Sequence, residues 1–263
     1  MSNIENIDSM LKENERIDEL GIDDLKIIQN TKYFCFGIDS VLLANFVNSN
    51  SSKSSILDLC SGSGVIPILL SSKVKYSRLY AVELQEEMFD LLDRNIVMNS
   101  LEEKIKHFNC DVNNLESIKN NLYNISGKYT VDIITVNPPY KPKNTGVINE
   151  DKVKHIARHE EKCTLRDVLN ISSKLLTDNG KLYLVHKPER LVDLLDIARE
   201  YKLEAKKIRF VYPRVDSNPS IVLVQYSKNG GNEIKVLPPL IEYDIEGNYT
   251  QDIYNIYGWK GSN

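Results

Sequence analysis

The stretch VDIITVNPPY, residues 131–140, joins a short apolar run to two consecutive prolines. Each proline fixes its own φ angle and lacks the N–H group that a strand ladder needs, so a strand cannot continue through Pro138 and Pro139. The chain must therefore leave a sheet at Asn137, which places one amide side chain at the carboxyl end of a strand. In open α/β sheets, ligands bind at that end of the strands.

Outward from this corner, short apolar runs alternate with helical patterns, which favours a parallel sheet with helices on both faces. We expect strands over residues 56–60, 78–84, 105–111, 131–136, 181–186, 208–212 and 221–226. Helices are predicted over residues 65–71, 85–99, 114–123, 165–177 and 189–201. The last two strands have no helix between them, so we expect a seven-stranded, mostly parallel α/β sheet with an antiparallel hairpin at one edge.

The front of the chain reads as a separate piece. Residues 1–19 are polar and are expected to be loosely ordered. A short strand is predicted over residues 25–30, and Asp39 suits the N-cap of a helix over residues 40–47. We therefore expect an N-terminal extension over residues 1–50.

A serine-rich spacer, residues 48–55, separates this extension from the main domain, which we place at residues 51–263. The tail after Lys228 contains no clear long helix, and we expect it to pack across the surface of that domain.

Composition restricts the class of protein. The chain of 263 residues is 41% hydrophobic and 27% charged, which is ordinary for a globular protein. Its net charge of −4 lowers the expectation of nucleic-acid binding without excluding it, because such binding depends on local lysine and arginine. There is no secretory apolar region, and no apolar run approaches the ~20 residues of a membrane span. We therefore expect a cytoplasmic protein with no membrane partner.

No metal site is expected. The cysteines are far apart and form no C-x-x-C pair; they are Cys35, Cys60, Cys110 and Cys163. His155 and His159 are four residues apart, but Glu160 follows the second histidine instead of lying between the two. This order differs from the H-E-x-x-H arrangement of zinc proteases.

A glycine-containing loop, DLCSGSG at residues 58–64, follows the first strand of the main domain. Glycines let the backbone approach a ligand closely, and the helix that follows favours a negative group at its N-terminus. Counted from Gly62, the third glycine of a G-x-G-x-x-G dinucleotide fingerprint falls on Pro67, which argues against a pyrophosphate cofactor. A plain turn that needs two glycines is the alternative.

Two further carboxylates are predicted at neighbouring strand ends. Glu83 closes the second strand, 25 residues after Asp58, where it can accept hydrogen bonds from both hydroxyls of a ribose. Asp111 closes the third strand and can accept one from the exocyclic amine of an adenine. Each acid alone is compatible with a solvated strand end, but three at one edge of the sheet favour a nucleoside ligand.

Together with the N-P-P-Y corner, these residues resemble the motif series of class I methyltransferases that use S-adenosylmethionine. The corner is similar to that of the subset that methylates planar exocyclic or amide nitrogens. The resemblance implies a Rossmann-like fold and S-adenosylmethionine as cofactor, bound by Asp58, Gly62, Gly64, Glu83, Leu84, Asp111, Val112 and Asn137. In this sequence, Cys60 stands where the first glycine of the loop is commonly found.

The corner suits transfer to a planar nitrogen. An adenine N6 amine is a poor nucleophile because its lone pair is delocalised into the ring. The Asn137 side-chain oxygen and the Pro138 carbonyl can each accept one of its N–H bonds, which localises the lone pair. Tyr140 can stack on the base, an interaction worth ~1–3 kcal/mol. The catalytic candidates are therefore Asn137, Pro138, Pro139 and Tyr140.

The flanking segments narrow the resemblance. Three segments are similar to the bacterial tRNA1(Val) adenine-37 N6-methyltransferase family: residues 21–46, which include the stretch 36–43, residues 157–160, and residues 212–224. That likeness implies tRNA as partner and adenine 37 of the anticodon loop as target, and it suggests that Phe36 and Asp39 help to close the cofactor pocket. Lys141, Arg158 and His159 can meet substrate phosphates at the pocket mouth. A solvated polar loop is the alternative for this segment.

Two alternatives stay open. A protein glutamine N5-methyltransferase of the release-factor type uses the same corner, although about 50 residues before Ile56 leave little room for the helical domain expected of such enzymes. A non-catalytic RNA-binding protein on the same scaffold is the second alternative, but it has no physical need for Asp58, Glu83, Asp111 and Asn137.

Overall fold

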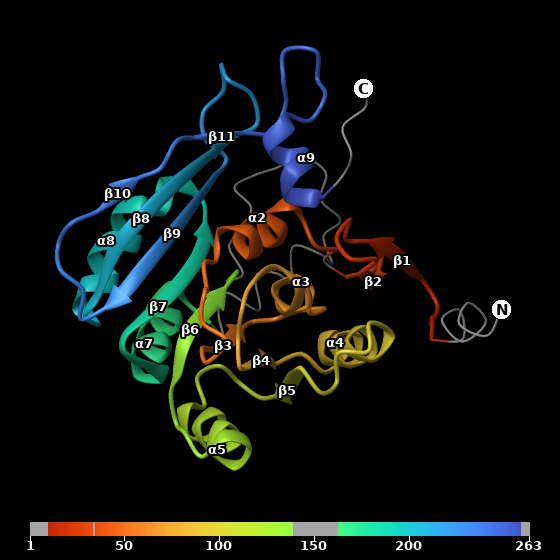
Figure 1. The fold of residues 1–263 in the computed structure, drawn as a ribbon, viewed down its shortest axis with the longest axis vertical. Helices are drawn as coiled ribbons and strands as arrows, with labels where there is room; N and C mark the ends of the chain where they lie inside the picture. Colours follow the sequence, from red (N-terminus) through yellow and green to blue (C-terminus); the bar gives the residue numbers. More distant parts are fainter. Residues whose placement is uncertain (1–9, 34, 139–162, 259–263) are drawn as a thin grey trace.

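The computed structural model describes residues 10–33, 35–138 and 163–258, whose course is drawn in Figure 1. Pro139 and Tyr140 of the corner lie outside these residues, as do Lys141, Arg158 and His159. Among the described helices, none is both long and apolar enough to cross a membrane.

The seven predicted strands form one sheet. They are β3 (Ser55–Leu59), β4 (Arg78–Glu83), β5 (Ile105–Asn109), β6 (Val131–Val136), β7 (Leu176–His186), β8 (Leu203–Tyr212) and β9 (Ile221–Lys228). Their order is β8-β9-β7-β6-β3-β4-β5, with β9 antiparallel to both β7 and β8 and the other pairs parallel. The hairpin is confirmed. Its strand β8 is not the edge, however, because two short strands, β10 (Lys235–Val236) and β11 (Leu240–Ile241), pair with it in parallel.

Helices cover both faces of the sheet (Figure 1). One face carries α2 (Ile38–Phe46), α3 (Val65–Lys73), α4 (Glu86–Met98) and α9 (Gln251–Tyr257), whose apolar side chains share one core cluster. The other carries α5 (Leu115–Ser126), α7 (Leu165–Leu175) and α8 (Leu191–Glu200), with a single 3₁₀ turn, η1 (Pro188–Arg190), leading into α8. The short α9 agrees with the prediction that the tail has no long helix.

Several boundaries differ from the prediction. Gly37 and not Asp39 is the N-cap of α2, and Asp39 lies in its first turn. β5 ends at Asn109, two residues before Asp111. β7 begins at Leu176 and β8 at Leu203, each five residues early. The first residues of β8 pair with β9 although they carry little apolar pattern, whereas β7 pairs with β6 at Leu176 and then, after a register shift, from Lys181.

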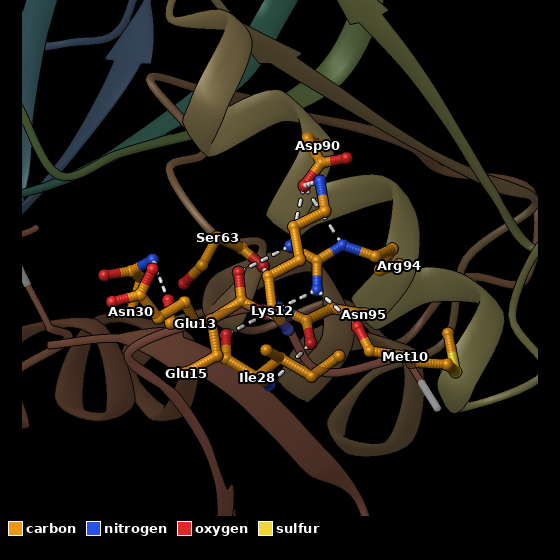
Figure 2. Close-up of polar contacts among 10 residues, drawn as sticks. All are labelled: Met10, Lys12, Glu13, Glu15, Ile28, Asn30, Ser63, Asp90, Arg94 and Asn95. Carbon is orange, nitrogen blue, oxygen red and sulfur yellow. Dashed lines mark hydrogen bonds and ion pairs between the residues drawn. The ribbon is translucent and has the colours of Figure 1, made fainter. Parts of the chain in front are cut away.

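The prediction that residues 10–19 are loosely ordered is wrong. The strand β1 (Glu15–Glu19) pairs antiparallel with β2 (Lys26–Asn30) in a separate two-stranded sheet. Arg94 of α4 fixes this hairpin with a bidentate ion pair, in which Nη1 and Nη2 each lie 2.7 Å from a Glu15 carboxylate oxygen (Figure 2). Because planar bidentate pairs are geometrically specific, the charged sequence of β1 supports a defined position instead of preventing one.

Candidate active site

The order of the strands creates a crevice at the centre of the sheet. The chain runs from β3 to β4 and β5 on one side and then returns to β6 on the other side of β3. Such a reversal is the topological switch point at which α/β sheets bind ligands. Asp58 lies on β3 and Asn137 follows β6 directly, so the sequence-predicted loop and corner meet there.

The glycine loop needs its two glycines. Gly62 has a φ of 54° and Gly64 one of 91°, both in the left-handed region that side chains disfavour. A Cβ atom at Gly64 would also lie 2.5 Å from Leu92 Cδ1 on α4. The backbone therefore lies directly against α4 at this point, and larger residues are excluded for both steric and conformational reasons.

Cys60 shares the left-handed conformation, with a φ of 57°. A Cβ atom in this region costs ~1–2 kcal/mol, so the backbone at Cys60 is strained where a glycine would not be. The Cys60 Sγ lies 4.0 Å from Cys163 Sγ, where the described chain resumes before α7. The contact with Cys163 and burial raise the pKa of Cys60, so this thiol stays protonated.

Asp58 is a buried carboxyl group with one free oxygen. Asp58 is only 1% exposed. Its Oδ1 accepts a hydrogen bond of 2.5 Å from Thr135 Oγ1 on β6. Oδ2 has no hydrogen-bond partner among the residues described. Burial raises the pKa of Asp58 to about 7, against the hydrogen bond from Thr135. A buried acceptor without a donor is costly, so Oδ2 fits a ligand that brings a donor or a positive charge.

Glu83 holds the glycine loop. Its Oε2 accepts from the Gly62 N–H at 2.8 Å, and its Oε1 accepts from the Gln85 N–H at 2.9 Å. Burial raises the pKa of Glu83, and the backbone hydrogen bonds oppose that rise. Each carboxylate oxygen has further acceptor capacity, so the group can bind the loop and still accept from a ligand hydroxyl.

Asp111 does not close a strand. It lies in the turn after β5, where its Oδ1 accepts from the Asn113 N–H at 2.8 Å. Val112 beside it is buried in the cluster under α5. The Leu84 carbonyl, after β4, accepts a hydrogen bond from the Asn109 side chain at the end of β5. The structure thus puts Asp111 past the end of the strand next to that of Glu83, in a turn and not in the ladder.

Asn137 is fixed from α2. Its Nδ2 donates to Ser40 Oγ at 3.1 Å, and Ser40 is buried in the first turns of that helix. With Nδ2 occupied in this way, Oδ1 is the amide atom left to accept from a ligand. Pro138, the last described residue of the corner, is buried.

Phe36 and Asp39, which precede Ser40 in the sequence, have different surroundings. Phe36 packs against the core cluster shared by α2 and α3. Burial raises the pKa of Asp39, and the positive charge of Lys187 after β7 opposes the rise. Glu242, after β11, lies near enough for the Asp39 charge to add to the rise that burial causes in its own pKa.

Three residues that position the site were not predicted from the sequence. Ser40 lies within a stretch that was already part of the resemblance, so its place four residues after Phe36 was a usable signal. Thr135 was visible only as a polar residue inside an apolar run. Asn95 of α4, which contacts the loop at Ser63, carried no signal because its partners are distant in the chain. Within the described parts of the chain, no group of three or more metal-binding side chains occurs.

Known proteins resemble this chain in sequence. The model of the TRM5/TYW2 methyltransferase domain family matches residues 41–161. A curated tRNA1(Val) (adenine(37)-N6)-methyltransferase from Parabacteroides distasonis is 28% identical over 191 residues, which cover 73% of this chain and 76% of the relative.

Solved structures share the fold. A predicted O-methyltransferase from Agrobacterium tumefaciens superposes with a TM-score of 0.64 at 17% identity, covering 84% of this chain and 95% of that one. M. jannaschii TYW2, solved in complex with AdoMet, has a TM-score of 0.54 at 16% identity, covering 82% and 87%. The chain is a methyltransferase with the class I fold, and it is similar to the tRNA1(Val) (adenine(37)-N6)-methyltransferases.

Proposed function

We propose that this methyltransferase transfers a methyl group from S-adenosylmethionine to the N6 amine of an adenine in tRNA, at position 37 of the anticodon loop. The observation that carries the proposal is the Asn137 amide, which lies at the switch point with its Nδ2 on Ser40 and its Oδ1 left to accept. The name of the curated relative supports the choice of tRNA and adenine 37. A tRNA substrate also agrees with the predicted cytoplasmic location.

The residues around the loop fit the cofactor. Gly62 and Gly64 let the ligand approach the backbone, and the free Oδ2 of Asp58 can accept from its ammonium group. Glu83 retains acceptor capacity for the ribose hydroxyls. When bound, the cofactor supplies a methyl group on a positively charged sulfur. The proposed contacts are those of Asp58, Gly62, Gly64, Glu83, Leu84, Asp111, Val112 and Asn137.

The corner acts on the nucleophile. The Asn137 Oδ1 and the Pro138 carbonyl accept hydrogen bonds from the two N–H groups of the N6 amine. These bonds localise the nitrogen lone pair and orient it toward the methyl group. Pro139 and Tyr140 are proposed to complete the corner, the tyrosine by stacking on the base. Lys141, Arg158 and His159 are predicted to contact substrate phosphates. The division into an N-terminal extension (1–50) and a methyltransferase domain (51–263) also stays a prediction.

The test combines purified protein and labelled S-adenosylmethionine with unmodified tRNA1(Val), or with release factor. Nuclease digestion of the product should yield N6-methyladenosine, and a transcript with guanine at position 37 should take up no label. Methylation of the guanine-37 transcript would show that the target nucleotide lies elsewhere in the tRNA. Label in the release factor alone would overturn the RNA assignment.

A further inference from the structure

Asn95 on α4 is a completely buried amide whose orientation is fixed by its partners. Its Oδ1 accepts from the Ile28 N–H at 2.6 Å, while its Nδ2 donates to the Ile28 carbonyl at 3.1 Å and to the Ser63 carbonyl at 2.9 Å. Because the oxygen faces a donor and the nitrogen faces two acceptors, the flipped amide would lose all three bonds. Figure 2 shows the side chain between Ile28 and Ser63.

Asn99, one helical turn after Asn95, makes the same pair of hydrogen bonds to the backbone of β2. It accepts from the Lys26 N–H at 2.9 Å and donates to the Lys26 carbonyl at 2.8 Å. Its remaining Nδ2 bond goes back to the Asn95 carbonyl within α4. The two amides therefore both dock β2 on α4, and they differ in one respect: only the Asn95 bonds extend to the glycine loop.

The Ser63 carbonyl is the point at which such a bond can act on the loop. Ser63 lies between Gly62 and Gly64, the two left-handed residues of the turn. Leu92, on the same face of α4 as Asn95, lies close to the Cα of Gly64. The loop backbone is thus held on one side by the Glu83 carboxylate and on the other by Asn95.

We propose that Asn95 is a positioning residue that holds the glycine loop in its cofactor-binding conformation through its bond to the Ser63 carbonyl. The proposal rests on the proposed function, since it takes the loop to bind S-adenosylmethionine. Loss of the Asn95 amide frees the Ser63 carbonyl, so the turn keeps the Glu83 carboxylate at Gly62 but loses its anchor on the other side. Asn95 is then part of the cofactor site without touching the cofactor.

The test compares Asn95→Ala with Asn99→Ala by calorimetric binding of S-adenosylhomocysteine. Asn95→Ala should weaken binding about tenfold, since it removes buried hydrogen bonds from the loop, whereas Asn99→Ala should change it less than about twofold. Asn95→Asp is the second variant. It keeps an acceptor for the Ile28 N–H and removes the donor to Ser63, so it should weaken binding similarly while thermal melting shows that the protein is folded.

Hydrogen exchange of the ligand-free proteins gives a readout independent of the cofactor. The Gly62 and Gly64 amides should exchange faster in Asn95→Ala than in wild type, and should be unchanged in Asn99→Ala. Equal effects of the Asn95 and Asn99 variants on both readouts would reduce Asn95 to general docking of the hairpin and overturn the inference. Wild-type protein that binds no S-adenosylhomocysteine would instead overturn the proposed function, and loop exchange would still decide whether Asn95 controls the loop.

Discussion

The glycine loop and the N-P-P-Y corner lie at the ends of adjacent strands, yet the protein holds them differently. The loop is bonded on two sides, by the Glu83 carboxylate at Gly62 and by the Asn95 amide at Ser63. Asn137, in contrast, is fixed through its own side chain by Ser40. The loop therefore offers a ligand a backbone surface of fixed shape. The corner offers one oriented side-chain atom, the Oδ1 of Asn137.

This difference separates two kinds of effect. Changes around the loop should alter cofactor affinity, because they alter the shape of a binding surface. Changes at the corner should alter the rate of transfer at saturating cofactor, because Oδ1 acts on the developing charge of the amine. Each of the following variants tests that separation.

Asn137→Ala should give the largest effect. Removal of the acceptor should lower kcat by about 10²–10³-fold, as for other groups that stabilise developing charge. The dissociation constant of S-adenosylhomocysteine should stay within about threefold of wild type. Single-turnover methylation of tRNA and calorimetry measure the two quantities. Normal turnover by the variant would show that the corner does not act on the amine.

Asp58→Asn should act on affinity, weakening cofactor binding by about 10–100-fold because a buried charge-assisted bond is lost. In wild type, binding should tighten as the pH rises from 6 to 8, because a cationic ligand favours the ionised carboxylate and the ligand-free pKa is about 7. Calorimetry across this range checks both statements. A pH-independent affinity in wild type would remove Asp58 from the cofactor contacts.

The same carboxyl group should make the ligand-free protein less stable at high pH. Its folded pKa of about 7 exceeds the ordinary value of 3.8, so the folded state binds more protons between these values and loses stability as the pH rises through them. Asp58→Asn should therefore be more stable than wild type at pH 8, by about 2–4 kcal/mol, and no more stable near pH 4. Denaturant unfolding at the two pH values measures this difference.

Ser40→Ala should lower kcat by about tenfold, because the Asn137 amide loses the contact that orients it. Cofactor affinity should be unchanged. Ser71→Ala on α3, whose hydroxyl bonds to the Ile68 carbonyl of its own helix, is the matched control and should retain full activity. An equal loss in both variants would mean that helix packing, and not amide orientation, sets the rate.

Thr135→Val should have the smallest effect. It removes the hydrogen bond to Asp58 without a change in volume, so the pKa of Asp58 should rise further and cofactor binding at pH 7 should weaken about threefold. Binding should recover when the pH is raised to 9. A loss that persists at pH 9 would show that Thr135 acts through packing.

The sequence was informative where apolar runs and backbone restrictions act locally. The run before Asn137 predicted β6 to the residue, and two prolines predicted the exit from the sheet. Gly62 and Gly64 marked the loop because glycine adopts left-handed backbone angles without the strain that a side chain adds.

Contacts between distant segments were not predictable in the same way. β1 is held by Arg94, which is 79 residues from Glu15, and its charged sequence resembles a solvated tail. Asp111 was placed at a strand end because the apolar run gave no sign that pairing stops at Asn109. Ser40 and Asn137 are 97 residues apart, so only the fold brings them together.

The bond between Ile28 and Asn95 also has a consequence for biosynthesis. The two residues are 67 positions apart, so the hairpin leaves the ribosome well before the helix that receives it. At about 5–20 residues per second, the delay is roughly 3–13 s, which is long compared with the microseconds in which hairpins form. An isolated two-stranded hairpin is marginally stable in water, so during that interval β2 lacks the docking that buries Ile28 in the folded protein. The contact that Asn95 gives to the glycine loop therefore forms only after α4 has been synthesised.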